Sequence, residues 1–226
     1  MDKLYHKPKP DEHPPWEQKR ARSKELTKQR FLQAVGSLIK QDGMKGLTTR
    51  KIAAVAGHSK RLIYDYFGSL DNLIREFLHK SDHWLSYEER MDKIRTDHKG
   101  DHGRELAALM LKNHLYSFYS DGLLQEVSLM ELANKNNELL IGIHQLRERV
   151  GDKVFAIFEE YFKGTNVNIR MIEALLIGGI NYLVLHSGSI GTTFCGIDIN
   201  KEQDRRELRA TLEQITQWAY DHAKER

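Results

Sequence analysis

Apolar residues recur along this chain at helical rather than strand spacing. After Pro15 the sequence has no proline and no convincing run of alternating apolar and polar residues, so we expect helices from residue 24 onward. The first predicted helix ends at Gly43 and has one apolar stripe. That stripe consists of Phe31, Leu32, Val35, Leu38 and Ile39. A stripe of this kind predicts a helix that packs two shorter helices into a three-helix head.

Two short helices separated by a glycine are predicted over residues 48–67. Thr48 is a common N-cap residue, Gly57 can adopt the left-handed conformation that ends a helix, and Ser59 can cap the next helix. The inward-facing residues are Ile52, Ala53, Ala56, Leu62, Ile63, Tyr64 and Phe67. Two short amphipathic helices joined in this way are typical of a helix-turn-helix.

The charge of this segment has one sign. No acidic residue occurs between Gly43 and Tyr64, whereas the basic residues there are Lys45, Arg50, Lys51, Lys60 and Arg61. The formal net charge of the whole chain is only +3, so the positive charge matters where it is clustered. Such a surface suits a polyanion, although a basic run can also be a solvated face without a partner.

These residues resemble the DNA-binding signature of the tetracycline-repressor (TetR) family of bacterial regulators. The matching positions are Gly43, Leu47, Thr48, Ile52, Ala53, Ala56, Gly57, Ser59, Tyr64, Phe67, Gly68 and Leu73. The resemblance implies that Tyr64 and Tyr66 contact phosphates and that the protein dimerises through its last two long helices. The sequence departs from the family at Leu70, where a phosphate-binding Lys is common, and at His58, where the turn usually buries Val or Ile.

The expected DNA-binding residues lie on both helices of this motif. They are Thr48, Thr49, Arg50, Ser59, Lys60, Arg61, Tyr64 and Tyr66. Lys60 and Tyr64 lie where the family contacts the DNA backbone, which positions a protein without reading the sequence. Arg61 and Arg50 are the candidates for base contacts, because a guanidinium can bind guanine through two hydrogen bonds in the major groove.

We expect three segments in the chain. Residues 1–23 are predicted to be an irregular basic N-terminal arm, residues 24–75 the helix-turn-helix DNA-binding domain, and residues 76–226 the effector-binding and dimerisation domain. All four prolines lie between Pro8 and Pro15, and several basic residues follow them. The arm is either a disordered tail or an extension that adds phosphate or minor-groove contacts.

The remaining helices are expected in the C-terminal two thirds of the chain. Their predicted ranges are 70–94, 104–120, 123–134, 138–163, 169–187 and 201–224. The helix over 169–187 is apolar almost all round, so it must be covered on several sides. The last helix has an apolar stripe that includes Leu212, and through this stripe it can pair with the helix over 169–187. We expect this hairpin to meet a second copy in a four-helix bundle, and a core role within one chain is the alternative.

Polar residues interrupt the apolar stripe of the helix over 104–120. Asn113 and His114 fall among positions that should face the core, and buried polar groups need partners. They either bond to one another, to tyrosines or to water, or they line a mostly apolar effector pocket. The expected pocket residues are Met110, Asn113, His114, Phe118, His144 and Tyr182.

The sequence gives little support for catalysis, metal binding or a cofactor. The pairs His79/His83 and His98/His102 have metal-ligand spacing but lack a third ligand at a fixed offset. Phosphate-loop and nucleophile motifs are missing, so we expect no enzyme, no metal and no cofactor. A single cysteine, a polar N-terminus and an apolar stretch shorter than the ~20 residues of a membrane span predict a cytoplasmic protein without a membrane anchor.

The sequence therefore predicts an all-α protein with an N-terminal helix-turn-helix head and a C-terminal helical bundle that includes a two-helix dimerisation hairpin. The predicted function is a ligand-responsive transcriptional regulator. Its partners would be a double-stranded DNA operator, a small effector of unknown identity and a second copy of the chain, with the effector releasing a repressor from a palindromic operator. A helical adaptor whose basic head binds an acidic protein is the alternative.

Overall fold

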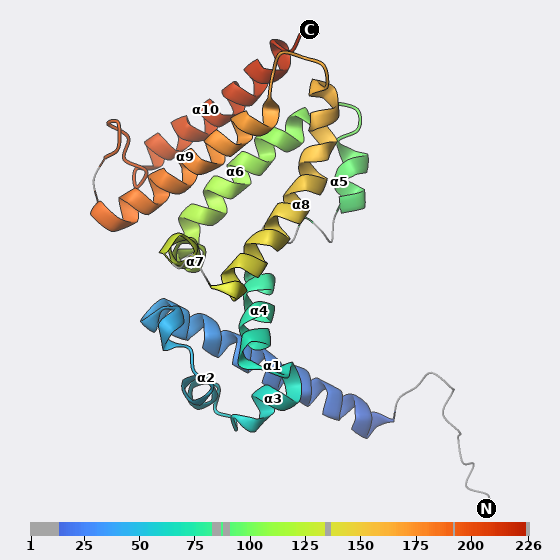
Figure 1. The fold of residues 1–226 in the computed structure, drawn as a ribbon, viewed down its shortest axis with the longest axis vertical. Helices are drawn as coiled ribbons and strands as arrows, with labels where there is room; N and C mark the ends of the chain where they lie inside the picture. Colours follow the sequence, from blue (N-terminus) through green and yellow to red (C-terminus); the bar gives the residue numbers. More distant parts are fainter. Residues whose placement is uncertain (1–13, 83–86, 88–90, 134–136, 192, 225–226) are drawn as a thin grey trace, which may run out of the picture. The chain divides into compact units, whose positions relative to one another are not determined.

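The computed structural model describes residues 14–82, 87, 91–133, 137–191 and 193–224, and these residues confirm the all-α prediction (Figure 1). The helices are α1 (Pro15–Asp42), the short 3-10 helix η1 (Met44–Gly46), α2 (Thr49–Ala56), α3 (Arg61–Phe67), α4 (Leu70–Ser81), α5 (Met91–Asp97), α6 (Arg104–Ser120), α7 (Gly122–Ala133), α8 (Glu138–Phe162), α9 (Ile169–Ile190) and α10 (Glu202–Asp221). The chain divides into two compact units, residues 1–77 and 78–226, and α4 runs across their boundary.

The first unit is built on α1. Its apolar side chains, with Phe31 at the centre, are buried against α2 and α3, and Ile52 and Ile63 are both inaccessible to solvent. The rings of Phe31 and Phe67 meet edge to face at 6.1 Å between centroids. Of the residues predicted to face inward, Tyr64 is instead 52% exposed. The others face one another in a small core, which holds the helix-turn-helix in place.

Helix α1 begins at Pro15, so the prediction of an irregular arm up to residue 23 is wrong for residues 15–23. Proline is tolerated in the first turn of a helix, where its missing N–H has no helical partner to lose. The residues after it are mostly good helix formers such as Glu, Gln, Lys, Arg and Ala. Residues 16–26 are exposed, so this basic segment is a helical extension of the head. Residues 1–13 lie outside the described residues.

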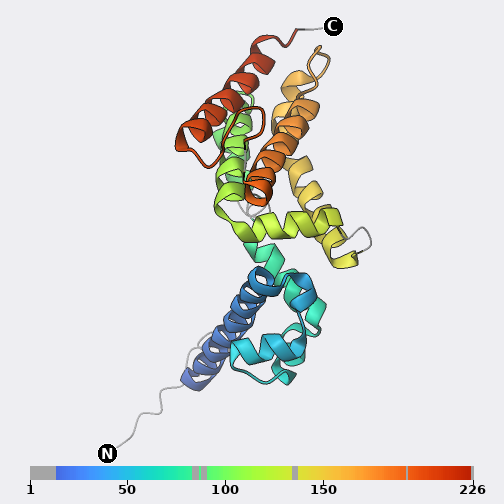
Figure 2. The same ribbon diagram turned by 90° about the vertical axis from the view of Figure 1, so that its left-hand side faces the viewer.

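The second unit is a bundle in which α6 packs between α9 and α10 (Figures 1 and 2). Helices α6, α8, α9 and α10 run side by side in both views, and α7 lies across one end of them. One apolar cluster joins α6, α8 and the C-terminal part of α10, and a second joins α6, α9 and Leu212 of α10. Most of the apolar positions predicted for these helices form the interior of this bundle.

Two expectations about helix bounds are corrected. Helix α4 ends at Ser81 rather than near residue 94, and α5 forms a separate short helix over residues 91–97. Residues 83–86 and 88–90, between these helices, lie outside the described residues. The other predicted helices of the second unit agree with the structure to within three residues at each end, because their ends carry local signals such as Asn137, whose side chain accepts hydrogen bonds from the backbone N–H groups of Leu139 and Leu140.

Helices α9 and α10 are oriented differently from the expectation. Leu212 is buried in the second cluster, so the apolar stripe of α10 faces the core of its own chain instead of a partner. Helix α9 is less covered than predicted, since Met171, Leu175 and Tyr182 on its outer face are 63, 75 and 51% exposed. Its residues 169–189 are also long and apolar enough to cross a membrane by length and composition, a test that core helices pass as well.

Candidate DNA-binding surface and effector cavity

The helix-turn-helix is fixed by local hydrogen bonds. The backbone N–H of Lys51 donates to the Thr48 hydroxyl at 3.2 Å, which caps α2 as predicted. Gly57 adopts the left-handed conformation with φ of 69° and ends α2. Ser59 stands one residue before the N-cap position of α3, and its hydroxyl accepts a hydrogen bond from the N–H of Arg61 at 3.3 Å. These contacts set the path of the turn between the two helices.

Most of the predicted DNA-binding side chains lie on the surface of the first unit. Thr48, Arg50, Ser59, Lys60, Arg61 and Tyr64 are exposed, whereas Thr49 and Tyr66 are half-buried. The side chain of Arg61 is 85% exposed, and its Nε lies 3.7 Å from a carboxylate oxygen of Asp65. Asp65 directly follows the acid-free segment and was not considered in the sequence analysis. An exposed pair of this kind is weak, so it costs little free energy to break.

His58 and the basic extension of α1 both have contacts within the first unit. The ring of His58 lies 5.8 Å from that of Phe31, and its Nε2 is 3.5 Å from Nη1 of Arg30. The ammonium group of Lys24 lies over the ring of Tyr66 at 5.3 Å, so the basic extension of α1 reaches α3. Neither His58 nor the long α1 disturbs the turn.

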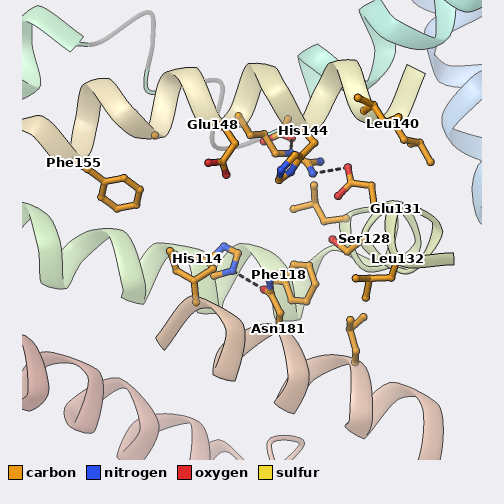
Figure 3. Close-up of a pocket in the computed structure, with 17 residues that line it drawn as sticks. His114, Phe118, Ser128, Glu131, Leu132, Leu140, His144, Glu148, Phe155 and Asn181 are labelled. Carbon is orange, nitrogen blue, oxygen red and sulfur yellow. Dashed lines mark hydrogen bonds and ion pairs between the residues drawn. The ribbon is translucent and has the colours of Figure 1, made fainter. Parts of the chain in front are cut away.

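A cavity of about 530 Å³ lies in the second unit, among α6, α7, α8 and α9 (Figure 3). The surface of its lining is mostly apolar, as in small-molecule sites generally, although eight of the seventeen lining residues have polar side chains. The lining residues are Asp82, His114, Phe118, Leu124, Ser128, Glu131, Leu132, Leu140, Ile141, His144, Arg147, Glu148, Gly151, Phe155, Ile177, Asn181 and Leu185. In Figure 3 the side chains of His144, Glu148 and Phe155 extend from α8 towards those of His114 and Phe118 on α6.

The structure brings together three of the six residues expected in the effector pocket. His114, Phe118 and His144 line the cavity. Met110 is instead buried in the first apolar cluster, and Asn113 lies on the exposed side of α6. Neighbouring residues of a helix point about 100° apart, so Asn113 and His114 cannot both face the same space. Tyr182 is on the outer face of α9, where its ring packs against Phe194 at 4.8 Å.

Several cavity residues were missed by the sequence analysis. Nε2 of His114 lies 2.7 Å from Oδ1 of Asn181, a contact that joins α6 to α9. Asn181 had a signal, because it is one of the few polar residues in the apolar sequence of α9. Arg147, Glu131 and Glu148 had none, since charged residues are common on amphipathic helices and their spacing does not show which face meets a cavity.

Arg147 carries a partly buried ion-pair network on the cavity wall. Its guanidinium donates to Asp82, and its Nη1 donates to Oε1 of Glu131 at 2.6 Å. The side chain of Asp82 is only 2% exposed. Burial by itself would lower the pKa of Arg147, but the charges and hydrogen bonds of Asp82 and Glu131 raise it above its ordinary value. The network therefore joins α7 and α8 to Asp82, which directly follows α4.

The histidines considered as metal ligands are arranged differently from the sequence pairs. His98 is grouped with Asp101 and Glu105, whose potential ligand atoms lie within 4.8 Å of one another. Both Asp101 oxygens already accept hydrogen bonds from the N–H groups of Gly103 and Glu105, so they serve to cap α6. His83 lies outside the described residues.

These observations define a helical protein with an exposed helix-turn-helix in one unit and a ligand-sized cavity in the other. Residues 32–77 match the family model for bacterial regulatory proteins of the tetR family. The helix-turn-helix of the first unit therefore lies within a segment that matches the TetR family model, which is where the sequence resemblance placed it. Comparison with curated protein sequences gives no match.

Two solved structures share the fold over most of the chain. The transcriptional regulator FadR from Bacillus subtilis, in complex with stearoyl-CoA, is 18% identical, and its TM-score is 0.56 over 83% of this chain and 96% of its own. The fatty acid degradation regulator FadR from Bacillus halodurans is 16% identical, with a TM-score of 0.54 over 88% of this chain and 97% of its own. These likenesses extend the assignment of the fold from the head to the helical body.

Proposed function

We propose that the protein is a repressor that binds a palindromic DNA operator as a homodimer and is released when a small effector occupies the cavity of the second unit. The observation that carries this proposal is the exposed basic surface of α2 and α3 within the segment that matches the TetR family. The cavity supports the effector-binding part, since its size and mostly apolar lining are typical of ligand sites. None of the comparisons supports the alternative of an adaptor for an acidic protein.

The proposed effector response runs through Arg147. This residue contacts the cavity and also holds Asp82, which directly follows α4, while α4 begins in the first unit. An effector that changes the position of Arg147 would change the support of this end of α4. A ligand shifts a conformational equilibrium only by its difference in affinity for the two states. We propose that the effector favours the state in which the two heads of the dimer no longer match the half-sites of the operator.

The proposed dimer contact is the outer face of α9. Met171, Leu175 and Tyr182 are exposed apolar side chains on one face of this helix, and Gly178 lies on the turn between Leu175 and Tyr182. Monomeric soluble proteins rarely expose a continuous apolar patch of this kind without a partner. A second copy, related by a two-fold axis, would cover the stripe with the same stripe.

Leu175→Glu is expected to convert the dimer into a folded monomer. Leu175 is 75% exposed in the single chain, so the charge leaves the monomer core intact but would be buried unpaired in the dimer. Sedimentation should show half the mass of the wild type, and the circular dichroism spectrum should stay unchanged.

Leu26→Glu, at an exposed leucine of α1, is the control and should remain dimeric. A Leu175→Glu protein that is still dimeric would refute this contact. Wild-type protein that is monomeric in buffer and binds lipid vesicles would assign α9 to a membrane instead.

Arg61→Ala is expected to relax the sequence preference at one base pair of each half-site. The binding free energy for the preferred sequence should become weaker by about 1 to 3 kcal/mol. Lys60→Ala should instead weaken binding to all sequences equally. The plot of log K against log salt should become less steep by about 0.9, because one phosphate contact is lost. Both side chains are exposed on the recognition surface. The measurement is a series of binding isotherms over single-base operator variants at matched salt. An equal loss across all variants for Arg61→Ala would identify it as a phosphate contact.

The operator for these measurements can be selected from genomic fragments by gel shift. Fragments bound at two salt concentrations should share a palindrome, and their affinity should fall steeply with salt. Binding without any preferred sequence would contradict the proposed regulator function.

A further inference from the structure

We propose that the effector cavity selects a lipophilic cation. This inference rests on the proposed function, because it names the chemical class of ligand for the same site. One arginine and three carboxylates line the cavity, so its formal charge is −2 with neutral histidines. The charged residues are Asp82, Glu131, Arg147 and Glu148. They share the cavity with a larger number of apolar side chains.

The positive charge of the single arginine of the lining is already paired with two carboxylates. The guanidinium of Arg147 donates to Asp82 and to Glu131, and its side chain is only 18% exposed. A carboxylate or phosphate bound to the remaining N–H groups of Arg147 would lie close to the carboxylates of Asp82 and Glu131. The repulsion between these negative charges opposes an anionic ligand.

Glu148 provides the acceptor for a positive charge. Its side chain lies on the cavity side of α8, one turn from His144, and extends towards α6 (Figure 3). Unlike Asp82 and Glu131, it has no ion-pair partner among the described residues. A ligand cation beside Glu148 would supply that partner and bring the charge of the lining closer to zero.

The aromatic residues of the lining favour the same class of ligand. Phe118 and Phe155 border the cavity from α6 and α8, and the face of an aromatic ring attracts a cation within about 6 Å. One face of the Phe155 ring is already covered by the guanidinium of Arg170 at 5.1 Å, so a ligand cation would use the other face or the ring of Phe118. The side chains of Leu140, Ile177 and Leu185 would bury the apolar part of the ligand.

Tetraphenylphosphonium and tetraphenylborate are matched probes for this inference, because they have nearly the same shape and opposite charge. Titration calorimetry and thermal shift of the full-length protein should detect binding of the phosphonium, with a higher melting temperature as the ligand stabilises the folded state. The borate should bind at least about tenfold more weakly, since three carboxylates oppose it. Stearoyl-CoA serves as the anionic, long-chain comparison.

Glu148→Gln removes one negative charge from the lining and keeps the shape of the side chain. It should weaken phosphonium binding about five- to tenfold and leave melting temperature without ligand almost unchanged, because Glu148 is exposed. Glu126→Gln is the matched control, since Glu126 is an exposed carboxylate on α7 outside the lining. It should bind the phosphonium as the wild type does.

The outcomes separate the inference from the function on which it rests. Equal phosphonium affinity in Glu148→Gln, Glu126→Gln and wild type would overturn the assignment of the cation to this cavity. Tighter binding of tetraphenylborate or stearoyl-CoA than of the phosphonium would overturn the cation class, while a regulator responsive to an anion would stand. Failure of the protein to bind any specific operator, with phosphonium binding intact, would instead refute the proposed repressor and leave the cavity chemistry standing.

Discussion

Arg147→Ala should destabilise the protein by about 3 to 5 kcal/mol, the range found when one partner of a buried ion pair is removed. The loss arises mainly because Asp82, only 2% exposed, is left without its guanidinium partner. Urea denaturation of the variant and the wild type at neutral pH measures the difference.

Arg149→Ala is the matched control for this prediction. Arg149 lies two residues away on the same helix and is exposed, so its removal should change the free energy of unfolding by no more than about 0.5 kcal/mol. An Arg147→Ala variant as stable as Arg149→Ala would show that the network around Arg147 is not buried in solution. It would also remove the support for the proposed route from the cavity to α4.

Glu173→Gln is expected to remove a large pH dependence of stability. Glu173 on α9 is inaccessible to solvent, and neither of its carboxylate oxygens has a hydrogen-bond partner among the described residues. Burial raises the pKa of its carboxyl group from 4.5 to about 8. Below pH 4.5 the group is protonated in the folded and unfolded chain alike. Between pH 4.5 and 8 the folded chain holds a proton that the unfolded chain has released, so this contribution to stability is lost as the pH rises.

The wild type should therefore lose up to about 1.4 kcal/mol per pH unit relative to Glu173→Gln across this window, with a constant difference above pH 8. Denaturation curves from pH 5 to 9 measure the difference between the two proteins. Glu126→Gln, at an exposed position, should follow the wild type at every pH. A Glu173→Gln curve parallel to that of the wild type would show that Glu173 is charged or solvated in the folded protein.

The sequence by itself determined the elements and the DNA-binding motif. Thr48, Gly57 and the apolar residues between and after them specify the caps, the turn and the inner face through contacts a few residues apart. For the same reason the bounds of α6 to α10 could be predicted closely. The start of α1 was missed because the prolines before it were taken as signals for an irregular segment, although Pro15 fits the first turn of a helix.

The tertiary structure alone decided which side chains meet at the cavity and which face of α9 is left exposed. Arg147 and Asp82 are 65 residues apart in the chain, and His114 and Asn181 are 67 apart. Helical periodicity places a residue on a stripe but does not show what that stripe faces, so Leu212 was assigned to a partner although it lies in the core. Such contacts depend on how several helices pack together, because each helix has more than one apolar surface that a neighbour can cover.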